Sequence, residues 1–196
     1  MKTPGALLTA LLAFCFMTAC GAGGNAPYTS TTKANPNIAF MGDSITNRWS
    51  LPTTNFGIYG NTTAQMRARF AGDVLGRGYK AVVILGGTND LLHIVEPTNQ
   101  VIAQAAINLQ AMAAAAEAEN IQVVLCEIPP IDNINDHVES LNQAIVALAE
   151  AHKYLVVDYY TPMAGHPEYF LDGVHPNDEG YAVMKAAFSK VLSIDY

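Results

Sequence analysis

Short apolar runs alternate with longer amphipathic stretches from residue 37 to the end of the chain. The apolar runs are rich in β-branched residues, have the length of buried strands and are bounded by turn-forming residues. They predict five strands, at residues 37–42, 55–60, 80–87, 121–128 and 153–160. Near-continuous apolar strands that alternate with helices are typical of a parallel sheet covered by helices on both faces.

The stretches between these runs carry the signals of helices. Apolar residues recur there at helical spacing, and cap-forming residues precede them. The helices are expected to begin near Thr62, Thr98, Asp136 and Asn177. The pattern therefore predicts an α/β protein, a three-layer α/β/α sandwich with a five-stranded parallel sheet in flavodoxin-like order, in one domain at residues 37–196.

The N-terminal residues have a different pattern. Lys2 precedes an apolar run at residues 5–19, which is shorter than the roughly 20 residues that a bilayer-spanning helix needs and is typical of a secretory signal. The run ends in "MTAC", which resembles the bacterial lipoprotein signal, in which a cysteine after small residues is lipidated and becomes the new N-terminus. Residues 1–20 are therefore expected to be a lipoprotein-type signal peptide, with lipidation at Cys20.

The mature chain is then expected to be exported and anchored, in the periplasm or at the cell surface. Residues 21–36 are rich in Gly, Ser, Thr, Asn and Pro and are expected to form a flexible linker. Cleavage after Gly21 or Ala22 is the alternative, and it would give a freely secreted protein.

Net charge limits the expected partners, and cysteine content limits the expected disulfides. The 196-residue chain has a formal net charge of −7, which argues against nucleic acid and anionic membrane surfaces as partners. The predicted lipid anchor is then the only expected contact with a membrane. Cys126 lies in a predicted strand and is expected to be a buried thiol, and no disulfide is expected in the mature domain.

Polar residues follow the ends of the predicted strands. They form the motifs at residues 42–44, 60–62 and 87–90, and Asp172 and His175 lie in a loop after the last strand. The carboxyl ends of parallel strands share one edge of the sheet, and ligands bind at that edge in open α/β sheets. These polar residues are therefore expected to gather in one place.

Acyl transfer needs these residue types. A hydroxyl such as that of Ser44 is a weak nucleophile until an imidazole such as His175 takes its proton, and the imidazole needs a carboxylate such as Asp172 to orient it. The developing oxyanion needs donors, and the backbone N–H groups of Ser44 and Gly60 and the side-chain amide of Asn89 are suitable. The alternative for Ser44 is a helix cap, because serine accepts hydrogen bonds from the first turn of a helix.

Four motifs carry a family resemblance. In order and spacing, "GDS" at 42–44, the glycine of "NFGIYGNTT" at 60, "GTND" at 87–90 and "DGVHP" at 172–176 resemble the sequence blocks of the GDSL, or SGNH, hydrolases, a family of esterases and lipases. The second block is also similar to that of the platelet-activating-factor acetylhydrolase-like and carbohydrate-esterase branches. The resemblance covers residues 37–194 and implies a flavodoxin-like fold and ester hydrolysis without a metal or other cofactor.

The resemblance also assigns roles. It implies that Ser44 is the nucleophile, His175 the base and Asp172 the acid that orients it, with Gly60 and Asn89 joining the Ser44 amide as oxyanion donors. The chain departs from the family pattern at Ile45, which replaces a leucine without changing the chemistry. Tyr59 stands where a small residue is common, so the site near Gly60 is expected to be narrower.

The expected activity is that of a serine esterase that cleaves short acyl esters, from acetyl to hexanoyl, through an acyl-enzyme. A small-molecule acyl ester is then the substrate, and an acetylated carbohydrate is one candidate. A lysophospholipase or thioesterase of the same family is an alternative. A non-catalytic lipoprotein that binds a glycan or a partner is another. A third is a metal-dependent phosphoesterase, because several side chains are acceptable ligands for hard cations. Those side chains are Asp43, Asn89, Asp90, Asp172 and His175.

Further residues near the motifs are candidates for lesser roles. The candidates for lining the substrate pocket are Tyr59, Tyr159, Tyr160 and Met163, although core packing explains the last three at least as well. Asp43 and Asp90 are expected to hold the loops by accepting backbone hydrogen bonds. His166 is the one other histidine close enough in sequence to compete with His175.

Overall fold

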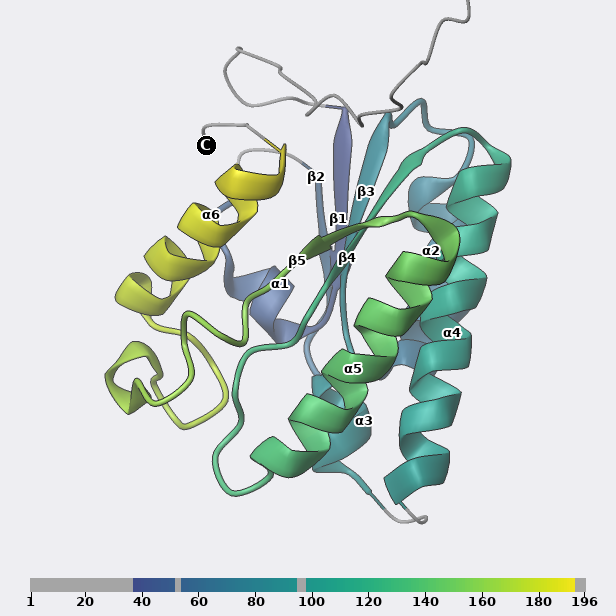
Figure 1. The fold of residues 1–196 in the computed structure, drawn as a ribbon. Coiled ribbons are helices and arrows are strands. Elements are labelled where there is room, and N and C mark those ends of the chain that lie inside the picture. The colour runs from purple at the N-terminus through teal and green to yellow at the C-terminus, as the bar shows by residue number, and fades with distance from the viewer. Residues whose placement is uncertain (1–36, 52–53, 95–97, 193–196) are drawn as a thin grey trace, which may run out of the picture.

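Five parallel strands form the sheet at the centre of the molecule (Figure 1). A computed structural model describes residues 37–51, 54–94 and 98–192. The strands are β1 (Ile38–Gly42), β2 (Thr54–Gly57), β3 (Ala81–Leu85), β4 (Gln122–Cys126) and β5 (Leu155–Val157). Their order is β2-β1-β3-β4-β5, and each neighbouring pair is parallel. The predicted parallel sheet and its flavodoxin-like order are confirmed.

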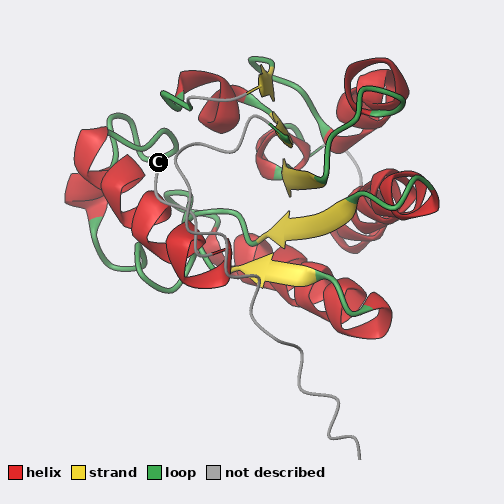
Figure 2. Cartoon of the chain, turned by 90° about the horizontal axis from the view of Figure 1, so that it is seen from above, coloured by secondary structure: helices red, strands yellow, loops and turns green. Residues whose placement is uncertain are grey.

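Helices cover both faces of this sheet, which gives the predicted three layers. The helices are α1 (Ser44–Arg48), α2 (Thr63–Val74), α3 (Thr88–Leu92), α4 (Thr98–Ala118), α5 (Asn135–His152) and α6 (Asp178–Leu192), and η1 (Pro167–Tyr169) is a short 3₁₀ helix. Helices α2, α4 and α5 lie on one face, and α1 and α6 lie on the other (Figures 1 and 2).

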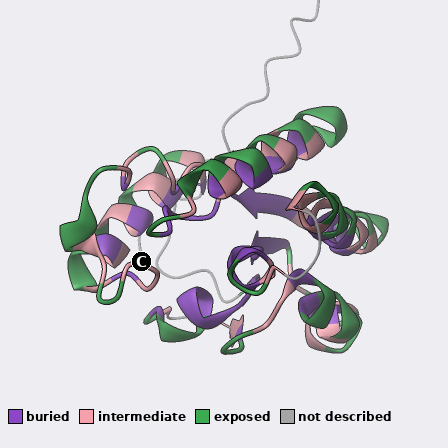
Figure 3. Cartoon of the chain, turned by 90° about the horizontal axis from the view of Figure 1, so that it is seen from below, coloured by how far each residue is buried: buried purple, intermediate pink, exposed green. Residues whose placement is uncertain are grey.

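The core lies between these layers. Every residue of β1 and β3 is buried, because these strands have a neighbour on each side and helices above and below. On the α6 face, the ring of Phe40 packs 5.6 Å from that of Phe188 and 6.2 Å from that of Trp49. Figure 3 shows buried residues on the sheet and on the inward sides of the helices, with exposed residues outside. The free thiol of Cys126 is buried in β4, as predicted.

Two short helices and one loop differ from the prediction. Helices α1 and α3 are single turns that directly follow β1 and β3, and they are too short for helical periodicity to reveal them. The second strand ends at Gly57, so Gly60 lies in a loop rather than at the strand end. The predicted signal peptide, the linker and Cys20 lie outside the described residues. Within the described part of the chain, no helix has the length and apolar content needed to cross a membrane.

Candidate active site

The turn between β1 and α1 decides between the two interpretations of Ser44. Asp43, not Ser44, is the N-cap of α1, and its carboxylate accepts a hydrogen bond from the backbone N–H of Ile45 at 2.9 Å. Because Asp43 performs the capping, the hydroxyl of Ser44 is left for another partner. The interpretation of Ser44 as a helix cap is therefore wrong.

That partner is His175, which is 131 positions away along the chain. Ser44 Oγ lies 2.9 Å from His175 Nε2. On the other side of the ring, His175 Nδ1 lies 2.8 Å and 3.1 Å from the two carboxylate oxygens of Asp172. When Nδ1 carries the proton and donates it to Asp172, Nε2 is free to accept the proton of the serine hydroxyl. The geometry is that of a base between a nucleophile and an orienting carboxylate.

The loop that carries Asp172 is shaped by its own carboxylate. One carboxylate oxygen accepts the backbone N–H of His175 at 2.8 Å and that of Val174 at 3.2 Å. Partial burial by itself raises the pKa of Asp172, but the hydrogen bonds from His175 and Val174 outweigh it and leave the pKa below its ordinary value. Asp172 is therefore a carboxylate at neutral pH, which is the form that holds the imidazole ring.

The three suggested oxyanion donors follow three neighbouring strands, β1, β2 and β3. Gly60 has a φ of 72°, a left-handed conformation that favours glycine, and no atom lies within 4 Å of the position that a Cβ would take there. Asn89 lies in the first turn of α3, and its Nδ2 donates to the carbonyl oxygen of Asn61, the residue after Gly60, at 3.1 Å. The side-chain amide of Asn89 therefore lies beside the Gly60 loop, and the Ser44 turn follows the neighbouring strand β1.

Two acidic residues hold these loops, as the sequence predicted. Asp43 caps α1, and Asp90 accepts the backbone N–H of Thr63 at 2.8 Å and its hydroxyl at 2.6 Å. The two bonds between Asp90 and Thr63 tie α3 to the start of α2. Both carboxyl groups are shielded from water, and burial raises the pKa of Asp90 and raises that of Asp43 to about 7.

Arg69 has a positioning role that the sequence analysis missed. From α2, its guanidinium donates to the carbonyl oxygens of Gly42 at 2.9 Å and Phe56 at 2.8 Å, and to the side chain of Asn61 at 2.8 Å. It thus joins the ends of β1 and β2 to the Gly60 loop. Nothing in the local sequence distinguishes Arg69 from a solvent-exposed helix residue, because its partners lie in other elements.

The predicted pocket residues divide into three groups. Tyr59 is 54% exposed, and its ring lies 6.5 Å from that of His175, so it lies at the mouth of the site. Tyr159 and Met163 are each 0% exposed and belong to the core, which corrects their assignment to the pocket. Tyr160 lies beside α5, where its hydroxyl donates to Glu139 at 2.7 Å.

The other candidates are placed elsewhere. The ring of His166 is paired with Glu168 and stacks on Tyr169, with centroids 4.8 Å apart, so it does not compete with His175. Among the described residues, no group of three or more histidine, cysteine, aspartate and glutamate side chains is arranged to hold a metal ion. Asp43, Asp90 and Asp172 each bond to a different partner instead.

Two pockets flank the site, and each is named here by one residue. The Asn89 pocket has a volume of about 370 Å³ and is lined by Thr62, Asn89, Asp90, His93, Gln100, Val101 and Gln104. The Arg48 pocket has a volume of about 410 Å³ and is lined by Arg48, Leu171, Asn177, Asp178, Glu179 and Tyr181, with Pro176.

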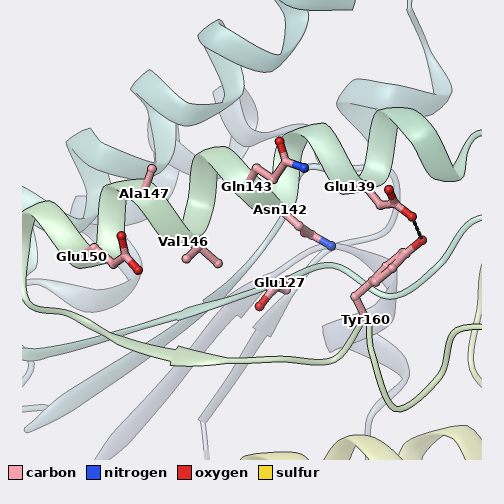
Figure 4. Close-up of a pocket in the computed structure, with 8 residues that line it drawn as sticks. All are labelled: Glu127, Glu139, Asn142, Gln143, Val146, Ala147, Glu150 and Tyr160. Atoms are coloured by element: carbon pink, nitrogen blue, oxygen red, sulfur yellow. Dashed lines mark hydrogen bonds between the residues drawn. The ribbon is translucent and has the colours of Figure 1, made fainter.

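A further pocket, the Glu127 pocket, lies apart from Ser44. It measures about 330 Å³ and is lined by Glu127, Tyr160 and the α5 residues Glu139, Asn142, Gln143, Val146, Ala147 and Glu150. Figure 4 shows it between α5 and the segments that carry Glu127 and Tyr160. None of the residues suggested as nucleophile, base or oxyanion donor lines it.

Comparisons with known proteins found one matching family model and similar solved structures. The model of the GDSL-like lipase/acylhydrolase family matches residues 18–183. Among solved structures, a GDSL-like lipase from Bacteroides thetaiotaomicron is 31% identical with a TM-score of 0.72, over 81% of this chain and 88% of that one. A comparison with curated proteins found no match.

More distant structures share the fold. A lipase/acylhydrolase from Enterococcus faecalis is 24% identical with a TM-score of 0.67, over 78% of this chain and 93% of that one. An acetylxylan esterase from Geobacillus stearothermophilus, a catalytic mutant, is 18% identical with a TM-score of 0.72, over 85% of this chain and 98% of that one. At these identities the likeness extends to the architecture alone.

Proposed function

Because this chain belongs to the GDSL-like lipase/acylhydrolase family, and is thus an ester hydrolase, we propose that Ser44, His175 and Asp172 form its catalytic triad. The proposed reaction is hydrolysis of carboxylic esters with short acyl groups, from acetyl to hexanoyl. The observation that carries the proposal is the unbroken line of hydrogen bonds from Asp172 through His175 to Ser44, with heavy-atom distances of 2.8 and 2.9 Å.

The proposed first half of the reaction follows from these hydrogen bonds. Ser44 Oγ attacks the carbonyl carbon while His175 Nε2 takes its proton, and Asp172 stabilises the imidazolium that forms. The oxyanion of the tetrahedral intermediate accepts hydrogen bonds from Ser44 N–H, Gly60 N–H and Asn89 Nδ2. His175 then gives the proton to the leaving alcohol oxygen, and the acyl group stays on Ser44.

Deacylation repeats these steps with water. His175 Nε2 takes a proton from the water as it attacks the acyl carbon, and the oxyanion forms again in the same hole. Collapse of the second intermediate returns the proton to Ser44 Oγ and releases the carboxylic acid. No step requires a group beyond the chain and water.

The size of the Asn89 pocket supports the proposal of short acyl groups. Its volume of about 370 Å³ lies near the lower end of the range of roughly 300–1,000 Å³ that is usual for small-molecule sites. A pocket of this size accommodates an acetyl to hexanoyl group, whereas the long acyl chain of a lysophospholipid would extend beyond it.

An acetylated carbohydrate is the proposed natural substrate. The fold is shared with a protein described as an acetylxylan esterase, and the exposed side chains of Tyr59 and Leu171 beside His175 and Asp172 leave space for a bulky alcohol. Export and lipid attachment at Cys20 are further proposals, and they rest on the N-terminal sequence alone. Anchoring would place the esterase where extracellular glycans are available.

Initial rates on p-nitrophenyl esters from acetate to decanoate test the proposal. The value of kcat/KM is expected to be highest between acetate and hexanoate, and Ser44→Ala is expected to lower it by about 10⁴-fold or more. EDTA is expected to have no effect, which separates this mechanism from a metal-dependent phosphoesterase. Turnover that survives Ser44→Ala, or the absence of turnover by the wild type, would overturn the triad assignment.

A further inference from the structure

The Arg48 pocket adjoins the catalytic histidine. Leu171 immediately precedes Asp172, and Pro176 immediately follows His175, so the catalytic loop itself forms one wall. Arg48 also lines the pocket, where its Nε donates a hydrogen bond to the hydroxyl of Tyr59 and its guanidinium carbon lies 5.5 Å from the centroid of that ring. The Tyr59 ring in turn lies 6.5 Å from His175.

The proposed mechanism fixes which part of an ester lies on this side. His175 Nε2 must reach the leaving oxygen to protonate it, so the alcohol part lies on the His175 side of Ser44. The carbonyl oxygen points toward Asn89 and Gly60 instead. The Asn89 pocket contains an oxyanion donor and belongs to that other side. The alcohol part therefore faces the Arg48 pocket.

The pocket combines hydrogen-bonding groups with apolar surface. Arg48 is exposed and offers planar N–H donors, while the exposed carboxylates of Asp178 and Glu179 offer acceptors. Beside them, Leu171 is 64% exposed and Tyr59 is 54% exposed, so both offer apolar surface to a ligand. A sugar ring needs both kinds of surface, because its hydroxyls both donate and accept and its C–H faces are apolar.

Charge narrows the ligand further. Arg48 brings one positive charge to the pocket lining, whereas Asp178 and Glu179 bring two negative charges, and Asp172 is adjacent to Leu171. This excess of negative charge disfavours an alcohol that carries a phosphate or a carboxylate. A volume of about 410 Å³ falls within the range of roughly 300–1,000 Å³ that is usual for small-molecule sites and is ample for one sugar unit.

We infer that the Arg48 pocket is the leaving-group subsite and that it binds a neutral, hydroxyl-rich sugar ring whose acetyl ester lies at Ser44. This inference rests on the proposed triad, because the position of the alcohol was derived from proton transfer by His175. Arg48 and Glu179 bind the ring hydroxyls, and Leu171 and Tyr59 contact its apolar face.

Two acetate esters of similar ring size test the subsite. One is a monoacetate of methyl β-xylopyranoside and the other is cyclohexyl acetate, which has the same acyl group and a six-membered ring without hydroxyls. The wild type is expected to favour the sugar ester at least tenfold in kcat/KM. Arg48→Gln and Glu179→Gln are each expected to reduce that ratio several-fold, mainly by raising KM for the sugar ester.

Matched variants control for the loss of charge. Arg77→Gln and Glu150→Gln remove the same charges from exposed positions outside the site, and they are expected to leave the ratio unchanged. Thermal unfolding of all four variants checks that the fold is retained. The acetate ester of glycerol 3-phosphate serves as an anionic probe and is expected to be a worse substrate than the sugar ester.

The possible outcomes distinguish a failure of the proposed subsite from a failure of the proposed triad. If the wild type hydrolyses both neutral acetates with equal kcat/KM, or if Arg48→Gln and Glu179→Gln leave the ratio intact, the subsite is wrong and the triad stands. A preference for the phosphate ester would overturn the assignment of a neutral sugar. If neither acetate is hydrolysed, or if Ser44→Ala is as active as the wild type, the proposed function itself fails.

Discussion

The Ser44 site and the Glu127 pocket are alike in two respects that are often taken to mark an active site. Each is associated with a hollow of more than 300 Å³, and each has a carboxyl group whose pKa burial raises to about 7, Asp43 in the first and Glu127 in the second. They differ in what surrounds that group. Only the first aligns a hydroxyl with an imidazole and a second carboxylate.

Three polar side chains of the Glu127 pocket are paired within the fold. Asn142 accepts the backbone N–H of Ile128 at 2.8 Å and donates to its carbonyl oxygen at 3.0 Å, and Glu139 accepts the Tyr160 hydroxyl (Figure 4). The raised pKa of Glu127 comes from burial and, to a lesser extent, from repulsion by Asp158. A perturbed pKa beside a pocket therefore does not by itself indicate catalysis. The proposed site is distinguished by a hydroxyl, an imidazole and a carboxylate that are joined in sequence by hydrogen bonds.

After Ser44→Ala, the largest effect is expected from Asp172→Asn. The amide cannot hold His175 in the tautomer that leaves Nε2 free, and in a well-studied protease the same change costs about 10⁴-fold in kcat. Because the Asp172 side chain is 51% exposed, water can replace part of its effect, and a loss of about 10³-fold in kcat is expected. Rates on p-nitrophenyl acetate measure it, and a kcat within tenfold of the wild type would contradict the triad.

The next largest effects are expected at two asparagines, Asn89 in the Ser44 site and Asn142 in the Glu127 pocket. Asn89→Ala removes a proposed oxyanion donor, and a loss of about 10²–10³-fold in kcat is expected. Asn142→Ala leaves the backbone N–H and carbonyl of Ile128 without a partner, so a loss of about 1–3 kcal/mol in the free energy of unfolding is expected, with kcat of the folded protein retained. Steady-state rates and urea unfolding of both variants measure this contrast. Equal losses of kcat in the two variants would contradict it.

A pair of glycines distinguishes the effect of backbone strain on stability from the effect of an added methyl group on activity. Gly60 and Gly76 have φ values of 72° and 68°, and at both positions no atom lies within 4 Å of an added Cβ. Alanine at either position is expected to cost about 1–2 kcal/mol in the free energy of unfolding. Gly60→Ala also places a methyl group where the substrate approaches, so it alone is expected to lower kcat/KM. Similar kcat/KM values for both variants would show that Gly60 has no role in the site.

The smallest effect is expected from Glu127→Gln. The pKa of Glu127 in the folded state is about 7, above its ordinary value of 4.5, so Glu127 stays protonated to a higher pH when the protein is folded. The free energy of unfolding is therefore expected to fall as the pH rises from 4.5 through 7. Glutamine has no charge to bury, so the variant is expected to lose less stability than the wild type between pH 5 and pH 8. Urea unfolding at both pH values tests this.

The same variant completes the comparison between the two pockets. The value of kcat/KM on p-nitrophenyl acetate is expected to stay within twofold of the wild type, because Glu127 lines no part of the Ser44 site. A large loss of activity would mean that the Glu127 pocket takes part in the reaction.

The sequence alone was sufficient to predict the parallel sheet, its strand order and the edge at which Ser44, Asn89 and His175 gather. Strand and helix periods are local, and the carboxyl ends of parallel strands must share an edge. Asp43 and Asp90 were also predicted correctly as residues that hold loops, because short acidic side chains next to turns commonly bond to backbone N–H groups.

Only the tertiary structure decided which neighbour each side chain has. It made Asp43 rather than Ser44 the cap of α1, buried Tyr159 while leaving Tyr59 exposed beside His175, and joined Arg69 to the ends of two strands. The burial of Tyr159, the position of Tyr59 and the bonds of Arg69 depend on contacts between segments that are remote in sequence. The cap is a local bond from Ile45 to Asp43, but the bond that Ser44 makes instead joins it to the remote His175. Local pattern carries no information about such contacts, because burial and hydrogen-bond partners are set by how the layers pack.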